Sequence, residues 1–251
     1  MDKKLFESVC QKIIGADRRR SGIGTLTEKT LHHVIKNYID PCENNHEVKV
    51  GRKFADIKSG SAITEIQTRS FNLLRRKLTD FLKEHTVTVV FPVANEKYIY
   101  WIDPESGETT EPRKSPKKGS ALDIFPELYK IRMFLSEPNL KFRILLLKVD
   151  EIRLKNGWSA DGKRGSYKYE NVPVELFDEV EISSLDDYKK LIPDGLPEVF
   201  NSKDFAKAAK RTVYRAQTAL NVLNHVGVVE RVSRNGRGYS YVIKNDTQKR
   251  E

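Results

Sequence analysis

The sequence predicts an α/β protein: a mixed β-sheet flanked by helices, followed by a small C-terminal domain of helices and a hairpin. Two observations carry this prediction. Three short strand-like runs within residues 46–66 precede an amphipathic helix and an unbroken β-branched run at 86–93. A helix between two such runs indicates a mixed sheet with a crossover connection. A second pattern, of two helices and two strands, follows Pro193.

The first half of the chain divides into helical and extended segments by its apolar spacing. Apolar positions at helical spacing predict helices at 3–14, at 25–40 with Thr27 as cap, and at 69–85. Short runs bounded by turn residues predict strands at 46–50, 53–57, 62–66, 86–93 and 97–102. The apolar run 86–93 is typical of a strand buried on both faces.

The second half is less regular. A polar loop at 103–119 is followed by a predicted helix at 122–136, a strand at 141–154 and a hairpin or loop at 156–169. An acidic amphipathic segment at 174–192 ends at Pro193-Asp194-Gly195. We place the domain boundary there, which gives a first domain of residues 1–195, with its core at 25–102 and an extension at 120–195, and a second of 196–251. The extension either enlarges the core or packs between the domains.

Composition excludes several classes of protein. The chain has 251 residues, enough to bury a substantial core. No apolar run approaches the roughly 18 to 20 residues of a membrane span, and the charged start lacks the apolar region of a secretory signal. Two cysteines, Cys10 and Cys42, are too few for a disulfide framework or a Cys-rich zinc site. We therefore expect a cytoplasmic protein without membrane contact.

The net charge of +10 is unevenly distributed. Residues 1–119 carry 22 basic and 16 acidic residues, 120–200 carry 12 and 15, and 201–251 carry 11 and 4. Two basic blocks separated by an acidic one favour a nucleic-acid protein with two contact modules. Helix faces that carry Lys and Arg for solubility alone are the alternative.

A pair of carboxylates stands out in the strand region. Asp56 and Glu65 lie in neighbouring predicted strands, and Glu65 shares one strand face with Gln67. The neighbours Ile57 and Ile66 point the other way, into a core. A carboxylate that faces inward costs several kcal/mol unless it is paired or binds a metal. Two of them on adjacent strands form the hard-oxygen site that Mg²⁺ prefers, unless both simply lie on the surface of an edge strand.

At these residues the chain resembles a known family. Residues 25–102 resemble the PD-(D/E)xK nuclease superfamily, which includes the restriction endonucleases and whose core is helix, three strands, helix, strand. Members carry Asp on the second strand and Glu-x-Lys on the third. Here Asp56 and Glu65 match these positions, and Glu28 matches a Glu that many members carry on the first helix. Gln67 stands where Lys is usual, and Ala55 replaces the Pro before the Asp.

The resemblance implies hydrolysis of a phosphodiester bond. Asp56, Glu65 and the Ile66 carbonyl would hold Mg²⁺, or Mn²⁺ in its place, with Glu28 as a further ligand. Such a metal polarises the scissile phosphate and activates water. Gln67 would orient that water by hydrogen bonds, without the positive charge of Lys.

Some of these roles have alternatives. Glu28 is equally a charge favoured by the dipole at a helix N-terminus, and Glu47 is the second candidate for a third carboxylate. His32 and His33 lie on the same predicted helix as Glu28 and receive no catalytic role.

Basic residues outside the carboxylate pair are candidates for nucleic-acid contact. Thr68 and Arg69 follow Gln67 at the start of the predicted helix, where backbone N–H groups can take a phosphate. Lys114, Lys117 and Lys118 in the polar loop are placed to follow a nucleic-acid backbone. Each of these residues is otherwise an ordinary surface charge.

The C-terminal block resembles a winged helix-turn-helix. A helix capped by Asn201 or Ser202 precedes a longer helix from Thr212, which ends at Gly227, and two strands then flank an Asn-Gly turn. The resemblance implies nucleic-acid contacts from the recognition helix through Arg211, Thr212, Tyr214, Arg215 and Gln217, and from the wing through Arg234 and Arg237. Modules of this class also serve as protein contacts.

The leading hypothesis is a metal-dependent DNA endonuclease of restriction, defence or repair. A DNA-binding regulator with an inactive nuclease-like scaffold is the alternative that Gln67 favours, and an RNA nuclease is a third. Cutting both strands of DNA often uses two active sites, so a homodimer is one expected arrangement.

Overall fold

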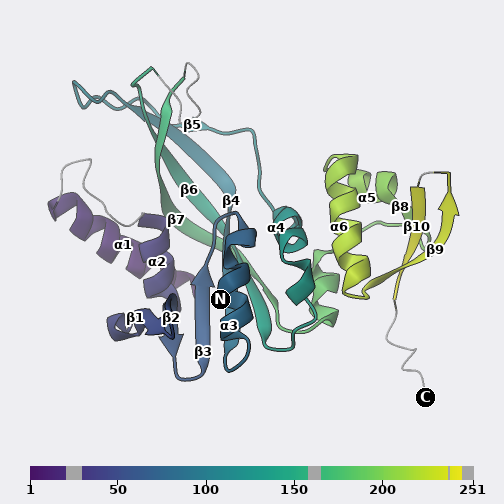
Figure 1. The fold of residues 1–251 in the computed structure, drawn as a ribbon. Coiled ribbons are helices and arrows are strands. Elements are labelled where there is room, and N and C mark those ends of the chain that lie inside the picture. Colours follow the sequence, from purple (N-terminus) through teal and green to yellow (C-terminus); the bar gives the residue numbers. More distant parts are fainter. Residues whose placement is uncertain (21–29, 158–164, 237, 245–251) are drawn as a thin grey trace.

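The computed structural model describes residues 1–20, 30–157, 165–236 and 238–244. Figure 1 shows a large twisted sheet with α1 and α2 on one side and α3 and α4 on the other. The α-helices are α1 (Lys3–Arg20), α2 (Thr30–Ile39), α3 (Arg75–Phe81), α4 (Phe125–Lys130), α5 (Ser202–Ala208) and α6 (Val213–His225). Short 3₁₀ turns are η1 (Glu43–Asn45), η2 (Phe71–Leu74), η3 (Ala121–Ile124), η4 (Arg132–Phe134) and η5 (Asp186–Leu191).

The strands form two sheets. They are β1 (His46–Val50), β2 (Lys53–Ser59), β3 (Ala62–Ile66), β4 (Thr86–Ile102), β5 (Arg113–Lys114), β6 (Leu140–Leu154), β7 (Tyr167–Ile182), β8 (Phe200–Asn201), β9 (Val229–Asn235) and β10 (Gly238–Ile243). The large sheet has the order β1-β2-β3-β4-β6-β7, with β5 paired to β4, and the small one has the order β8-β10-β9. β4 runs parallel to β3 and β6, while the other pairs are antiparallel. The predicted mixed sheet, with a helix between two parallel strands, is confirmed.

Both faces of the large sheet are covered, because side chains of its central strands alternate between two cores. Val89 and Phe91 of β4 pack in the core that contains η2, α3 and α4. Val90, between them, packs in the core of α1 and α2. This alternation explains why 86–93 is apolar at almost every position.

Two predicted strands prove to be one. β4 continues from Thr86 to Ile102, with an irregularity in its pairing to β6 between Ala94 and Glu96. At this point the side-chain amide of Asn95 donates a hydrogen bond to the Gly119 carbonyl at 2.9 Å. Beyond this irregularity β4, β6 and β7 extend into an arm that projects from the sheet (Figure 1).

Several predicted helices differ from those observed. The helix predicted at 69–85 begins at Phe71 as a 3₁₀ turn, because Ser70 has a left-handed backbone (φ 62°), and α3 ends at Phe81. The helix predicted at 122–136 is broken into η3, α4 and η4. The broken segment buries Ile124, Leu128 and Ile131 as well as one continuous helix would. The apolar periodicity therefore could not distinguish a continuous helix from three short ones.

The remaining boundaries also shift. α1 extends beyond the predicted 3–14, and α2 is described only from Thr30, so the predicted cap at Thr27 lies outside the described residues. The segment 174–192 falls on β7 and η5. Only part of the connection predicted at 156–169 is described, since 158–164 lie outside the described residues.

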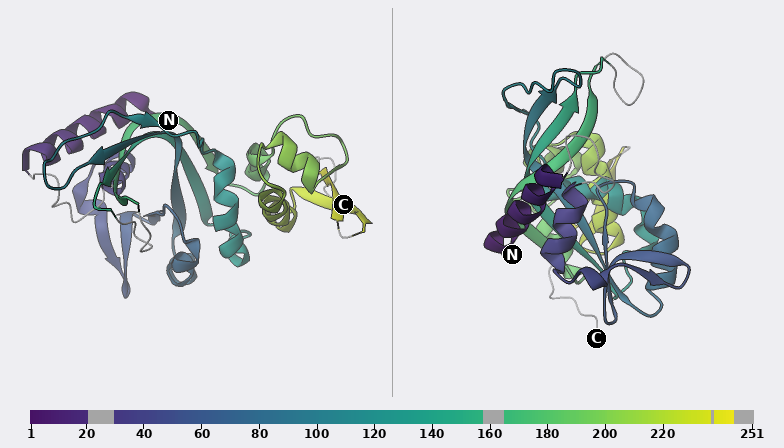
Figure 2. Two further views of the ribbon diagram at one scale, coloured as in Figure 1. Left: turned by 90° about the horizontal axis from the view of Figure 1, so that it is seen from above. Right: turned by 90° about the vertical axis from the view of Figure 1, so that its left-hand side faces the viewer.

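The C-terminal unit (residues 200–244) contains the two predicted helices and the hairpin. Asn201 caps α5 by accepting from the N–H of Lys203 and Asp204, and Thr212 caps α6. Gly227 ends α6 with a left-handed backbone (φ 81°). Figure 2 shows this unit beside α4, at one end of the large sheet.

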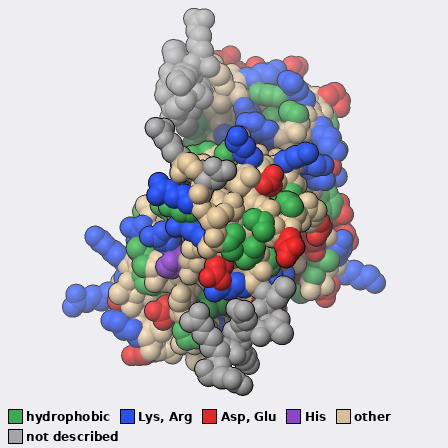
Figure 3. All heavy atoms as spheres, turned by 90° about the vertical axis from the view of Figure 1, so that its right-hand side faces the viewer, with side chains coloured by type: hydrophobic (Ala, Val, Ile, Leu, Met, Phe, Trp, Pro, Cys, Tyr) green, Lys and Arg blue, Asp and Glu red, His purple; other side chains and the backbone are tan. Residues whose placement is uncertain are grey.

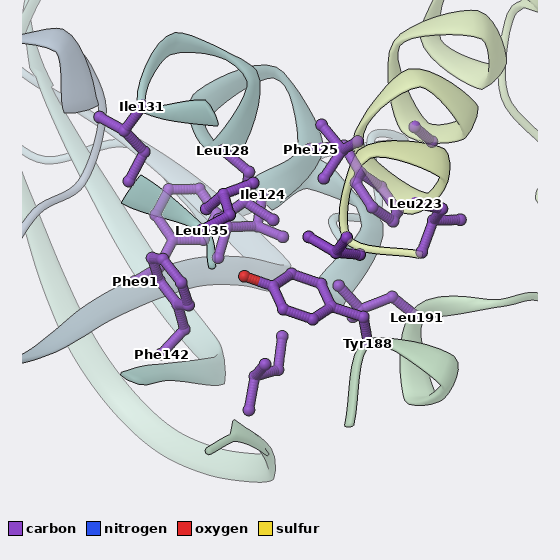
Figure 4. Close-up of a cluster of buried hydrophobic side chains, with 14 of the residues drawn as sticks. Phe91, Ile124, Phe125, Leu128, Ile131, Leu135, Phe142, Tyr188, Leu191 and Leu223 are labelled. Atoms are coloured by element: carbon purple, nitrogen blue, oxygen red, sulfur yellow. The ribbon is translucent and has the colours of Figure 1, made fainter. Parts of the chain in front are cut away.

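A continuous apolar core joins this unit to the large sheet. Tyr188 and Leu191 of η5 pack with Phe125 and Leu128 of α4 and with Leu223 of α6, as Figure 4 shows. All five side chains are at most 2% exposed. The C-terminal unit is therefore held against the sheet by packing as well as by the chain connection.

Candidate functional site

Two neighbouring strands bring the carboxylate pair (Asp56 and Glu65) together. β2 and β3 pair with Ile57 opposite Thr64, so the preceding Asp56 lies beside the following Glu65. Ile57 and Ile66 are buried, as the sequence predicted. Glu65 is buried as well, with 2% exposed, because helices cover both faces of the sheet.

The Asp56 carboxylate is held by β3 and α2. Its Oδ2 accepts the N–H of Ile66 at 2.6 Å, at the point where β3 ends. The Nε2 of His32 on α2 lies 3.3 Å from the same oxygen and 3.2 Å from the Ile66 carbonyl oxygen. The Asp56 carboxylate and the Ile66 carbonyl are therefore close neighbours, linked by one imidazole nitrogen.

Glu65 is held by a lysine of α3. Its Oε2 is 2.7 Å from the Nζ of Lys77 on α3. Its Oε1 is buried and has no hydrogen-bond partner among the described residues. A buried carboxylate oxygen without a donor is costly, which marks this atom as the place where a cation or proton would stabilise the site.

The pKa values of the two carboxyl groups are shifted in opposite directions. Burial disfavours the charged form of Asp56, but hydrogen bonds and charge from His32 and the Ile66 N–H outweigh it and hold the pKa of Asp56 below its usual range. Burial, followed by the charge of Asp56, raises the pKa of Glu65 to about 7 despite Lys77. Strongly shifted pKa values in neighbouring carboxyl groups are typical of functional sites.

A cleft of about 1000 Å³ opens beside His32 and Ile66, and neither Asp56 nor Glu65 is among its described lining residues. One wall is the end of β3 with the following loop, from Ile66 to Arg69, and another is Tyr167–Asn171 of β7. His32 lines the cleft with Pro92, Val93 and Ala94 of β4. Through His32 and Ile66, the cleft reaches the groups that contact Asp56.

Gln67 lines the cleft, but its side-chain amide already forms a hydrogen bond within the chain. Its side-chain nitrogen donates to the Arg69 carbonyl, and its backbone N–H bonds the Val90 carbonyl at 2.9 Å. Thr68 and Arg69 are exposed, and Arg69 lines the cleft. The expectation that they begin a helix is wrong, because Ser70 intervenes and the first free N–H, of Phe71, is taken by Glu127 at 2.8 Å.

The third carboxylate is not established. Glu28 lies outside the described residues. Glu47 lines the cleft, and its Oε1 pairs with Lys36 Nζ at 2.7 Å. Within the described parts of the chain, no three His, Cys, Asp or Glu side chains are grouped closely enough to hold a metal.

Sequence reasoning missed two residues of this site, His32 and Lys77. Each lies beside the apolar stripe of its helix, next to Leu31 and Leu78 respectively. Their positions depend on how α2 and α3 cross the sheet, which spacing along one helix does not reveal. The signal available was indirect: a buried carboxylate requires a partner.

The predicted nucleic-acid residues separate into two places. Lys117 and Lys118 line a second hollow of about 820 Å³ together with Lys97, Lys210, Arg211 and Arg215. Lys114 lies on β5 instead, where its Nζ pairs with Glu96 at 2.5 Å. We call the second hollow the basic groove.

Four of the five predicted recognition-helix residues are exposed, namely Thr212, Tyr214, Arg215 and Gln217, and Arg211 is the exception. Tyr214 is 78% exposed and Gln217 is exposed. Arg211, expected near the exposed face, has a side chain only 21% exposed that bonds Ser120 Oγ at 2.8 Å. Arg234 is exposed on β9, and Arg237 lies outside the described residues.

The fold and site place the chain among α/β proteins with a mixed sheet and a carboxylate pair on its central strands. Residues 29–183 match the model of a family described as a domain of unknown function (DUF8091), and the chain belongs to this family. It is 27% identical over 226 residues to an uncharacterized protein of Treponema pallidum (strain Nichols), covering 87% of this chain and 86% of that protein. No solved structure matches it significantly. Among the described helices, none is both long enough and apolar enough to cross a bilayer.

Proposed function

We propose that the protein is a Mg²⁺-dependent endonuclease that hydrolyses phosphodiester bonds of DNA, with the carboxylate pair as its metal site. One observation carries the proposal. One buried and one part-buried carboxylate on adjacent strands, with a lysine against the buried one, lie near a cleft of about 1000 Å³. The order of three antiparallel strands, a helix and a parallel strand also agrees with the PD-(D/E)xK resemblance.

The residues present suit Mg²⁺. The oxygens of Asp56, of the Ile66 carbonyl and of Glu65, whose Oε1 lacks a partner, are hard donors. Two carboxylates and one carbonyl leave the remaining positions to water and substrate, which is how Mg²⁺ is commonly bound. When bound, Mg²⁺ would supply Lewis-acid polarisation of a phosphodiester.

The chain's own side chains would supply the rest. Lys77 provides, beside Glu65, the positive charge that Gln67 lacks. Gln67 lies at the cleft, where its amide can hold water once it leaves the Arg69 carbonyl. Arg69, exposed in the same wall, would bind a phosphate of the substrate.

Cleavage of supercoiled plasmid DNA with Mg²⁺ or Mn²⁺ tests the proposal. We expect the wild-type chain to nick or linearise the plasmid, and Asp56→Ala to reduce the rate by about a thousandfold or more, as loss of a metal ligand does. Glu137→Gln, an exposed carboxylate outside the site, is the matched control and should cleave at the wild-type rate. Mg²⁺ should also raise the thermal midpoint of the wild type and of Glu137→Gln, but not of Asp56→Ala.

The second candidate is a DNA-binding protein with an inactive nuclease-like scaffold. It is favoured by His32, whose Nε2 already contacts both the Asp56 carboxylate and the Ile66 carbonyl. If wild type and Asp56→Ala bind DNA equally and neither cleaves, the enzyme proposal fails and this candidate replaces it. The same cleavage assay with single-stranded RNA identifies a ribonuclease, which would cleave the RNA and leave the plasmid intact.

A further inference from the structure

The basic groove brings together residues that are far apart in the sequence. Six cationic side chains line it, from the strand β4, the loop before η3 and the start of α6: Lys97, Lys117, Lys118, Lys210, Arg211 and Arg215. Among the described residues, Asp123 is the only carboxylate in its lining, and Lys97 also pairs with Glu151 at 2.8 Å. Such an excess of positive charge in a hollow favours a polyanion.

The lysine loop of the groove is fixed to the sheet. The N–H of Ser115 bonds the Lys97 carbonyl at 2.8 Å, and the N–H of Gly119 bonds the Ala94 carbonyl at 3.1 Å. A Cβ on Gly119 would lie 2.6 Å from the Ala94 oxygen, so only glycine permits this approach. Lys117 and Lys118, held between these anchors, are exposed and have no carboxylate partner among the described residues.

The opposite wall is fixed by Asp123. Its Oδ1 is 2.7 Å from Arg215 Nη1, and its Oδ2 is 3.4 Å from Arg211 Nη2. The two guanidinium groups are thus oriented in the groove before any ligand binds. Lys210, beside them, is exposed.

The groove and the cleft share residues of β4. Pro92, Val93 and Ala94 line both hollows, although the rest of the groove lies on the α4 side of the sheet and the rest of the cleft on the α2 side. In Figure 3, which shows the outer face of the C-terminal unit, the visible Lys and Arg side chains are interspersed with carboxylates and hydrophobic groups.

We propose that the basic groove binds the phosphodiester backbone of the DNA whose scissile bond lies in the cleft. The inference rests on the function proposed above. It moves the main contact of the C-terminal unit from an exposed recognition helix and wing to the inner side of α6. Backbone contacts by lysine and arginine position DNA without reading its sequence.

Fluorescence anisotropy with a labelled DNA duplex, in EDTA so that no cleavage occurs, tests this inference. The double variant Lys117→Gln/Lys118→Gln should weaken binding about tenfold or more near 0.1 M salt. The slope of log K against log salt concentration should fall by about 2, roughly 0.9 for each lost phosphate contact. Both lysines are exposed, so thermal midpoints should stay unchanged.

The matched control is Lys3→Gln/Lys4→Gln, which removes two exposed charges from α1, on the other side of the sheet. It should bind as the wild type does. Arg234→Gln tests the wing and should change affinity less than twofold. Binding by the Lys117/Lys118 variant that equals the control, or a loss confined to Arg234→Gln, would overturn the inference.

The outcome separates this inference from the proposed function. If the wild type cleaves plasmid while the groove variant binds normally, the groove inference fails and the nuclease stands. If the wild type binds but does not cleave, and the groove variant loses binding, the groove stands and the nuclease fails. A wild type that neither binds nor cleaves DNA overturns both.

Discussion

The carboxylate pair and the basic groove differ in how far their charged groups are buried and paired. At the pair, Glu65 is buried and Asp56 is part-buried, and each has a cationic or imidazole neighbour, Lys77 or His32. In the groove, the positive groups stand in an open hollow, where Arg211 and Arg215 share Asp123 and Lys97 pairs with Glu151 at 2.8 Å. Burial makes the first site sensitive to the loss of any partner, whereas solvent screening makes the second sensitive to the number of charges.

The largest expected effect is at Lys77. Replacing it by Met removes the cation beside buried Glu65, so we expect a loss of about 3 kcal/mol in unfolding free energy at pH 8. The loss should be smaller at pH 5, where a protonated Glu65 needs no cation. Urea unfolding at both pH values measures it, with exposed Lys83→Met as control. An equal loss at both pH values would assign Lys77 a packing role only.

Gly119→Ala should break the groove without removing a charge. The added methyl meets both the Ala94 oxygen and the Val93 side chain at 2.6 Å, so the lysine loop must move away from β4. We expect a loss of about 2 kcal/mol in stability, as overpacking typically costs, and severalfold weaker DNA binding by anisotropy. Gly15→Ala in α1, where the added methyl meets nothing and the backbone φ is not positive, controls for glycine replacement. Unchanged stability and binding in Gly119→Ala would contradict the tight anchoring of the loop.

Glu65→Gln should stabilise the protein at high pH. The pKa of Glu65 is about 7 in the fold against an ordinary value of 4.5, so the fold prefers the protonated group. Wild-type stability from this group is therefore complete below pH 4.5 and is lost as the pH rises through 7. The glutamine variant escapes this loss and should be more stable at pH 8, on the order of 2 kcal/mol, and unchanged near pH 4. Denaturation curves that differ equally at both pH values would refute the shifted pKa.

Asp123→Asn has the smallest expected effect. Because its two ion pairs are partly exposed, we expect a loss of less than about 1 kcal/mol in stability. The salt dependence of DNA binding should become steeper, by about 1 to 2 in log-log slope, since Arg211 and Arg215 then neutralise only phosphate. A slope equal to the wild type's would place both arginines outside the contact.

The sequence carried more information about the sheet than about the site. Runs of β-branched residues and turn glycines predicted β1 to β3 and the start of β4 to within a few residues, because both signals are local. Asp56 and Glu65 were predictable as a pair, since each is a charge among apolar strand neighbours. His32 and Lys77 were not, because they reach the pair from two helices on opposite faces of the sheet.

The basic groove was hidden for a different reason. Lys117 and Arg211 were each predicted as nucleic-acid contacts, but on separate modules. What joins them is the attachment of the lysine loop at Gly119 and the ion pairs of Asp123, both of which are long-range. No local pattern in either segment indicates the other, so their convergence required the folded chain.

The apolar core shared by α4, η5 and α6 has a consequence for how DNA would be cut. Because Leu223, Tyr188 and Phe125 pack in one cluster, the C-terminal unit is not free to swing on a linker. The two hollows then lie at a constant separation along the backbone that they hold. Every cut would then fall at the same number of nucleotides from the phosphates that the groove binds.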